Sequence, residues 1–257
     1  MGRMIATVAK ERGHEIVCIV DQAVESSQTV SPEEQRLFGN YYSEAFRSAD
    51  VAIEFSRPDA AEKNVRAAMA QGVAVVSGTT GWNVEALKEE MQNAKCKMNK
   101  NSAEQRREQN NDHPGIIWSS NYSIGVNILF AVNKYLARLL QNSGGYSPSI
   151  TEIHHIHKLD APSGTAVTLR EGIVESRKSA VEQHREPNSV ECPIESVREG
   201  EVPGIHEVRW ESEADILTLK HEAKSRKGFA LGAVLAAEWL KGKKGWHTMS
   251  EVMEIDN

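Results

Sequence analysis

The stretch that decides the fold is VAIEFSRPDAAEKNVRAAMAQGVAVVSGTTG, residues 51–81. An apolar run is followed by a segment with apolar residues at helical spacing, and a second apolar run closes the stretch. Asp59 is the expected N-cap of the helix and Gly72 its end. The helix face that we expect to be buried consists of Val65, Ala68 and Met69. Two near-continuous apolar strands joined by a helix predict a parallel βαβ unit.

The same alternation of strands and helices extends to both sides of this unit. Upstream, helical spacing at Met1, Met4, Ile5 and Val8 with a stop at Gly13 predicts an opening helix, and EIVCIVD (15–21) predicts a strand. Downstream we expect a helix over 84–94, a strand at GIIWSS (115–120) and a long helix. The apolar register of the long helix is Leu129, Val132, Leu136, Leu139 and Leu140. The predicted fold class is α/β, with a Rossmann-like doubly wound parallel sheet.

The second half of the chain changes character. The segments SPSITEIHHIHKLD, HEVRWES and DILTLKHEA predict strands, and a helix is expected near 165–178. This combination predicts a smaller α+β domain with a mixed sheet. The apolar helix in GFALGAVLAAEWLKGK (228–243) is expected to pack back on the first domain. We therefore predict a dinucleotide-binding domain at 1–126 with 232–257, and a second domain at 127–231.

Composition excludes several classes of protein. The chain has 257 residues with 30 Lys and Arg against 36 Asp and Glu, a net charge of -6 that argues against binding to nucleic acid or an anionic membrane. No signal peptide or membrane span is expected. Three cysteines without CxxC spacing favour a reducing compartment, so a cytoplasmic location is expected. The polar segment 96–115 is interpreted as a solvated insertion.

Ligands of doubly wound folds bind at the carboxyl ends of the strands. Asp21 ends a predicted strand about twenty residues after Gly2, where an acid is expected to bind the ribose hydroxyls of a dinucleotide. Gln22 follows in place of an Arg, which favours NADH over NADPH. The alternative for Asp21 is an ordinary turn residue. Only Gly2 represents the Gly-rich loop, so we expect the chain to lack the first strand and most of that loop.

Two further segments follow predicted strands. GTTGW offers Gly78, Thr79 and Thr80, whose backbone N–H groups and hydroxyls are expected to contact the cofactor. SSNYS offers a similar set after the next strand. Its members are Ser119, Ser120, Asn121 and Tyr122. For each segment alone, a turn with a helix cap is the alternative.

A cationic cluster stands in EIHHIHKLDAPSGTA, residues 152–166. If 150–158 is a strand, His154 and Lys158 share one face. The following turn leads into a helix whose first N–H groups, near Gly164 and Thr165, favour an anion. Imidazoles, an ammonium and a helix start together predict a site for a small carboxylate, with His as a proton donor. Zinc on His-x-His with Glu152 or Asp160, and a solvated basic strand, are the alternatives.

The same fifteen residues closely resemble the signature E-x-H-H-x-x-K-x-D-A-P-S-G-T-A of the 4-hydroxy-tetrahydrodipicolinate reductase (dihydrodipicolinate reductase) family. Similar segments occur in the same order over nearly the whole chain, namely GTTGW, SSNYSIGVN, REGEVPGIHEV and SRKGFALGAVLAAEWLKGKKGW. The resemblance implies NAD(P)H-dependent reduction of a cyclic dicarboxylate imine on the diaminopimelate route to lysine. It also implies a homotetramer assembled through the sheet of the substrate domain.

Residue roles follow from this resemblance. His154 resembles the proton donor and Lys158 its partner, and His155, Gly164 and Thr165 resemble contacts to the substrate carboxylates. The implied cofactor contacts are Gly2, Asp21, Gly78, Thr79, Thr80 and the stretch from Ser119 to Tyr122. No metal is implied. The alternatives are another two-domain nicotinamide oxidoreductase and a truncated, non-catalytic homologue.

Overall fold

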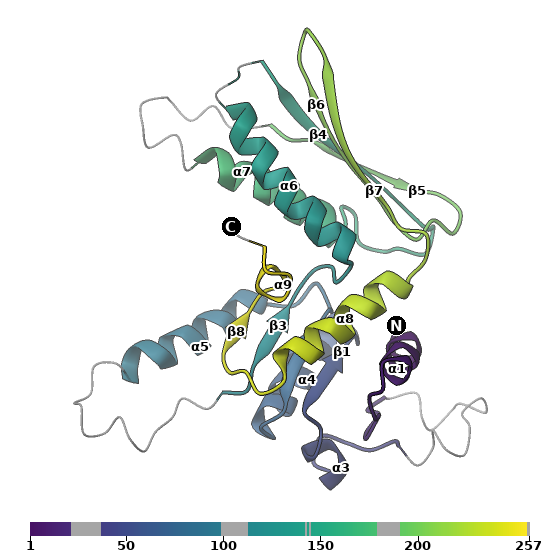
Figure 1. Ribbon diagram of the computed structural model, residues 1–257, viewed down its shortest axis with the longest axis vertical. Coiled ribbons are helices and arrows are strands. Elements are labelled where there is room, and N and C mark those ends of the chain that lie inside the picture. The colour runs from purple at the N-terminus through teal and green to yellow at the C-terminus, as the bar shows by residue number, and fades with distance from the viewer. Residues whose placement is uncertain (22–36, 99–112, 142, 144, 179–190, 256–257) are drawn as a thin grey trace. The chain divides into compact units, whose positions relative to one another are not determined.

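The computed structural model describes the chain except residues 22–36, 99–112, 142, 144, 179–190 and 256–257 (Figure 1). Two compact units are present. The first comprises Met1–Ser119 and Ala230–Glu254, and the second includes Ser120–Phe229. The roles and boundaries predicted for the two domains stay a prediction. The segment 96–115, interpreted as an insertion, falls mostly outside the described residues.

The first unit is built on a parallel sheet with the strand order β1-β2-β3-β8. Its strands are β1 (Val51–Glu54), β2 (Ala74–Ser77), β3 (Ile116–Trp118) and β8 (Trp246–His247). All three pairings are parallel, with Val75 opposite Ile116 at the centre. Because both faces of β2 are covered, all four of its residues are buried, as the continuous apolar run predicts.

Helices cover the two faces of this sheet. They are α1 (Gly2–Glu11), α3 (Glu44–Arg47), α4 (Pro58–Ala70), α5 (Val84–Met98), α9 (Met249–Val252) and the greater part of α8 (Lys227–Leu240). One apolar cluster joins α4 and α5 to Val75, and another joins Ile5 of α1 to Ala230 and Val234 of α8. The opening helix and the packing of the late apolar helix are therefore confirmed.

Two local predictions in this unit are wrong. The segment 15–21 forms only an isolated bridge, Ile19 to Phe38, rather than a strand. The N-cap of α4 is Arg57 with Pro58 in the first turn, so Asp59 lies inside the helix. Proline fits this position because its missing N–H has no helical partner there, and Asp59 still favours the positive end of the helix dipole.

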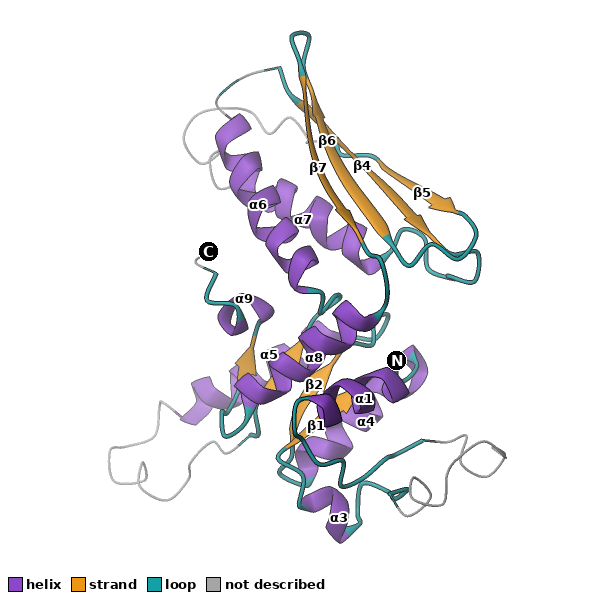
Figure 2. Ribbon diagram, turned by 45° about the vertical axis from the view of Figure 1, so that its right-hand side comes forward, coloured by secondary structure: helices purple, strands orange, loops and turns teal. Residues whose placement is uncertain are grey.

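The second unit holds the mixed sheet that the sequence predicts, in the order β5-β4-β6-β7. The strands are β4 (Ser147–His154), β5 (Ile194–Arg198), β6 (Ile205–Glu211) and β7 (Ile216–Glu222). β5 is parallel to β4, whereas β6 is antiparallel to both β4 and β7. Figure 2 shows α6 (Ile124–Gln141) and α7 (Gly164–Lys178) against one face of this sheet.

The core of the second unit lies between those helices and the sheet, around Trp210, Ile150 and Leu169. On α6, Leu129 and Leu140 are buried as expected, but Val132 and Leu139 are 41% and 52% exposed. The buried positions between them are taken by Asn133 and Ala137, and the Asn133 amide donates to the Leu169 carbonyl of α7. The predicted face of α6 is therefore partly wrong, because Asn133 is a polar residue that occupies a buried position. None of the described helices is both long and apolar enough to cross a bilayer.

Candidate active site

The end of β4 carries the centre of the site. Alternation along this strand buries Ile150, Glu152 and His154 on the face that α6 and α7 cover. The strand ends at His154, and residues 156–157 form a turn. The prediction that Lys158 continues the strand on the face of His154 is therefore wrong. Two apolar residues beyond the strand end are exposed, Ile156 by 61% and Leu159 by 98%.

Glu152 is a fully buried carboxylate with partners from three segments. Its Oε1 accepts from the Arg198 guanidinium of β5 at 3.0 Å and from the Ser163 backbone N–H at 3.3 Å. Its Oε2 contacts Nδ1 of His154. Burial by itself raises the pKa of Glu152, but hydrogen bonds from Arg198 and Ser196 and the charge of His154 hold it below its ordinary value. Glu152 is therefore ionised and accepts the Nδ1–H of His154.

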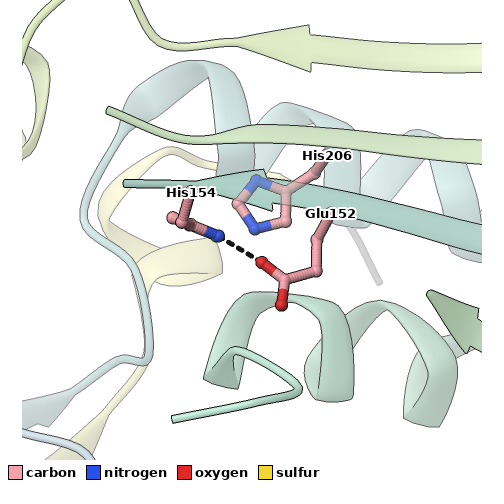
Figure 3. Close-up of side chains that lie close together, drawn as sticks. All are labelled: Glu152, His154 and His206. Atoms are coloured by element: carbon pink, nitrogen blue, oxygen red, sulfur yellow. Dashed lines mark hydrogen bonds and ion pairs between the residues drawn. The ribbon is translucent and has the colours of Figure 1, made fainter. Parts of the chain in front are cut away.

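His206 of β6 lies beside this pair, as Figure 3 shows. The register places it directly opposite Glu152, and its ring meets that of His154 edge-on at a centroid distance of 5.0 Å. Burial, with a smaller contribution from His154, lowers the pKa of His206 to about 3. The ring is neutral, and its Nε2 lies 3.3 Å from the Ser163 hydroxyl. His206 lies in the segment REGEVPGIHEV that resembles the family, but it was assigned no role from the sequence, and the pairing of β4 with β6 places it here.

Glu152, His154 and His206 are also the described residues that could share a metal ion, with ligand atoms within 4.8 Å of one another. The zinc site considered from the sequence used the His-x-His pair, which includes His157. In the structure His157 instead contacts Glu201 at 3.0 Å. The Arg198 guanidinium already occupies Glu152 and would repel a cation, so the contacts favour a hydrogen-bonded cluster over a metal centre.

The other cationic residues lie just beyond the strand end. Lys158 forms an ion pair with Asp160 at 2.8 Å, and its side chain is 22% exposed. His155 accepts a hydrogen bond at Nε2 from Arg226 at 2.8 Å. Burial first, and then the Arg226 charge, lowers the pKa of His155. Arg226 was assigned no role from the sequence, although it lies in the quoted segment SRKGFALGAVLAAEWLKGKKGW.

The start of α7 lies against the same strand. Ser163 caps the helix, since its hydroxyl accepts from the Ala166 N–H at 3.2 Å, and the same residue bonds Glu152. Gly164 and Thr165 form the first turn, and Thr165 accepts at its hydroxyl from the Asn121 amide at 3.0 Å. The predicted carboxylate contacts Gly164 and Thr165 are thus joined to His154 through Glu152 and Ser163.

The predicted cofactor segment 119–122 is divided between the two units. Ser119 is buried at the end of β3, where its N–H donates to the Ser77 carbonyl. Ser120 bonds Thr168 of α7 at 3.0 Å, in the second unit. Tyr122 as a whole is 1% exposed and therefore belongs to the interior.

In the first unit, the loops after β1 and β2 are locked together. Glu54 is buried and accepts from the Ser56 backbone N–H at 2.7 Å, the Ser77 hydroxyl at 2.6 Å and the Thr79 hydroxyl at 2.9 Å. The Thr79 carbonyl accepts from the indoles of Trp82 and Trp118. A Cβ on Gly78 would lie 2.3 Å from the Phe55 ring, so any larger residue would force that ring to move. Thr80 lies in the same loop, half-buried.

Two residues of this unit are spaced as a dinucleotide site requires. Gly2 begins α1, whose first turn has no acidic residue, and a Cβ on Gly2 would meet no atom within 4 Å. A ten-residue helix start of this kind leaves N–H groups that favour a phosphate. Asp21 is exposed at the end of the extended segment. That Gly2, Asp21 and the loop Gly78–Thr80 contact a nicotinamide dinucleotide stays a prediction.

Comparison with known families gives two matches. The family model described as dihydrodipicolinate reductase, N-terminus, matches residues 1–103, and that described as dihydrodipicolinate reductase, C-terminus, matches residues 125–253. Together the two matches cover both units apart from a short interval.

Curated relatives carry the name 4-hydroxy-tetrahydrodipicolinate reductase. The protein of Christiangramia forsetii is 40% identical over 254 residues, which are 98% of this chain and 93% of that protein. The protein of Archaeoglobus fulgidus is 34% identical over 80% of this chain and 76% of its own. A solved structure, a dipicolinate-bound dihydrodipicolinate reductase from Paenisporosarcina sp. TG-14, has a similar fold with a TM-score of 0.65. It is 22% identical, over 97% of this chain and 94% of that one.

Proposed function

This chain belongs to the dihydrodipicolinate reductase family, and from that membership we propose that it reduces 4-hydroxy-tetrahydrodipicolinate to tetrahydrodipicolinate with a nicotinamide cofactor. The reaction belongs to the route to diaminopimelate and lysine. This proposal is supported by one observation: Glu152 contacts His154 at the end of β4 and also accepts from the Ser163 N–H at the start of α7. The cationic side chains and the helix N–H groups are thereby held together. A ring with two carboxylates needs one anion contact of each kind.

The residues divide the binding of this substrate among them. Lys158 and His155 stand just beyond the strand, where an ammonium and an imidazole can meet one carboxylate. The N–H groups of Gly164 and Thr165 at the start of α7 meet the other. Without substrate, the Lys158 ammonium donates a hydrogen bond to the Asp160 carboxylate. The substrate carboxylate then competes with Asp160 for this ammonium.

His154 supplies the proton. The overall change adds a hydride and a proton to the ring and releases water, and the bound reduced nicotinamide is the source of the hydride. Hydride addition leaves an electron-rich enamine, which an imidazolium protonates. Burial lowers the pKa of His154 while Glu152 opposes that shift, and the charges of a bound dicarboxylate add to the effect of Glu152. Substrate binding therefore favours the protonated ring.

The cofactor contacts are assigned to Gly2, Asp21 and the loop Gly78–Thr80, with the backbone of the segment 119–122. NADH is the preferred cofactor, because the Asp21 carboxylate accepts the ribose hydroxyls and repels the additional phosphate of NADPH. Support for the loop comes from Glu54, which fixes its position through Thr79.

The chain assembles as a homotetramer through the sheet of its second unit. Support comes from β7, which is an edge strand with Ile216 49% and Leu217 39% exposed. An edge strand of this length pairs readily with another chain. A cytoplasmic location agrees with Cys18 and Cys192, which are free thiols.

The experiment is a spectrophotometric assay of the purified chain with 4-hydroxy-tetrahydrodipicolinate and either NADH or NADPH. We expect substrate-dependent oxidation of NADH, a higher KM for NADPH, and competitive inhibition by pyridine-2,6-dicarboxylate. Oxidation that requires a different acid, with no inhibition by the dicarboxylate, would assign the chain another substrate. Failure to quench or enhance NADH fluorescence would refute the cofactor assignment. Light scattering at micromolar concentration tests the tetramer.

A further inference from the structure

The structure assigns Glu152 the role of a positioning residue, which fixes the Nδ1–H of His154 and thereby makes Nε2 the atom that donates the proton. This inference rests on the proposed function, since it takes His154 as the proton donor, and it goes beyond it by naming the atom and the group that selects it. Glu152 does not reach the substrate in this role, because its carboxylate is fully buried.

Glu152 cannot turn away from His154. Its Oε1 is held from two sides, by Arg198 on β5 and by the Ser163 N–H at the start of α7. Arg198 is fixed in turn by donating to the Asp160 carbonyl at 2.7 Å. Only Oε2 remains for the imidazole, so the ring orientation is set by three chain segments.

The opposite ring nitrogen, Nε2, makes no hydrogen bond to another described residue, and it is not among their fully buried unpaired atoms. Gly204 packs close to it, since a Cβ at that position would lie 3.1 Å from Nε2. With Nδ1 bonded to Glu152 and Nε2 unbonded, the two nitrogens have different tasks. His206 fills the side of the ring with a neutral imidazole.

The proton then follows a balanced path. In the imidazolium form both nitrogens carry hydrogen. The Nε2–H bond breaks and a C–H bond forms with the electron pair of the enamine carbon. His154 is left neutral with Nδ1–H still bonded to Glu152, which stays ionised throughout.

The surrounding charges decide how sensitive this arrangement is to pH. The charged and titratable groups that face His154 are Glu152 on its own strand, Lys158 and Asp160 after it, Arg198 on β5 and His206 on β6. Lys158 and Arg198 oppose protonation of the ring, and Glu152 favours it. Removing the charge of Glu152 therefore leaves the ring among cations.

The test compares Glu152→Gln and Glu152→Asp with Glu195→Gln, a matched change of an exposed glutamate on β5. We expect Glu152→Gln to lower kcat about 100-fold or more at pH 7. The falling limb of kcat at high pH should move about one unit toward acid, because the protonated ring is lost earlier. Glu152→Asp should shift the falling limb of kcat less than Glu152→Gln does. Glu195→Gln should give the same kcat and the same pH profile as the unaltered enzyme. The Kd of pyridine-2,6-dicarboxylate should change only a few-fold.

A purely structural role would predict a loss of kcat that is uniform in pH, and that result would overturn the inference. Histidine-selective ¹⁵N NMR gives a second readout, with the His154 signal identified by its absence in His154→Gln. We expect the Nδ1–H form in the unaltered protein and in Glu152→Asp, and a change of tautomer in Glu152→Gln. The Nε2–H form in the unaltered protein would refute the inference even if Glu152→Gln does not fold. Inactivity of both the unaltered enzyme and Glu195→Gln would instead count against the proposed function, because the tautomer is read without turnover.

Discussion

His206 should make the protein sensitive to acid, and replacing it should remove part of that sensitivity. Burial lowers its pKa from 6.5 to about 3, so at intermediate pH the unfolded chain binds a proton that the folded chain does not. Stability from this residue is fully present above about pH 6.5 and is lost as the pH falls toward 3. The slope is about 1.4 kcal/mol per pH unit, which gives about 3 kcal/mol between pH 6.5 and about pH 4.5.

The assay is urea denaturation at several pH values and one protein concentration, with His206→Gln and the matched variant His157→Gln. The side chain of His157 is 67% exposed, so its replacement should leave the slope unchanged. His206→Gln should lose about 3 kcal/mol less than the unaltered protein over that interval, whatever its stability at neutral pH. Parallel slopes for His206→Gln and the unaltered protein would refute the reasoning that His206 is buried in its neutral form.

Three further substitutions test other contacts. Gly78→Ala should destabilise the protein by about 1–3 kcal/mol and weaken NADH binding, because its Cβ would collide with Phe55. Thermal melts and NADH fluorescence measure the two effects. Gly228→Ala is the control, because a Cβ there meets no atom within 4 Å. Ser163→Ala should cost about 1 kcal/mol in urea denaturation through loss of the α7 cap, and Ser163→Thr should keep most of it. Lys158→Ala should raise the KM for the substrate tenfold or more with a smaller change in the KM for NADH, whereas Lys241→Ala, which breaks an exposed pair with Asp50, should change neither.

The periodicity of apolar residues correctly predicted α4 and β2. The helix face around Val65 and the buried strand at 74–77 follow from side-chain periodicity, which sequence displays directly. The segment 15–21 failed because a strand also needs partners, and the structure gives it only the bridge from Ile19 to Phe38. Apolar composition indicates burial in such a segment but does not supply a hydrogen-bonding neighbour.

The centre of the site was only partly predictable for a similar reason. The motif named His154, Lys158 and Thr165, which are close in sequence, and their roles stay predictions. His206 and Arg198 come from β6 and β5, and only the strand register brings them to Glu152. The end of β4 was missed because apolar residues continue beyond it, and Ile156 lies in the turn after the strand.

In the proposed reaction His154 donates the proton while its neighbours hold the dicarboxylate. The most direct measurement is kcat for His154→Gln beside its Kd for pyridine-2,6-dicarboxylate and for NADH. We predict a fall in kcat of about 10²–10⁴-fold with both Kd values changed only a few-fold. An unchanged kcat, or a fall matched by an equal loss of dicarboxylate affinity, would mean that His154 is not the proton donor.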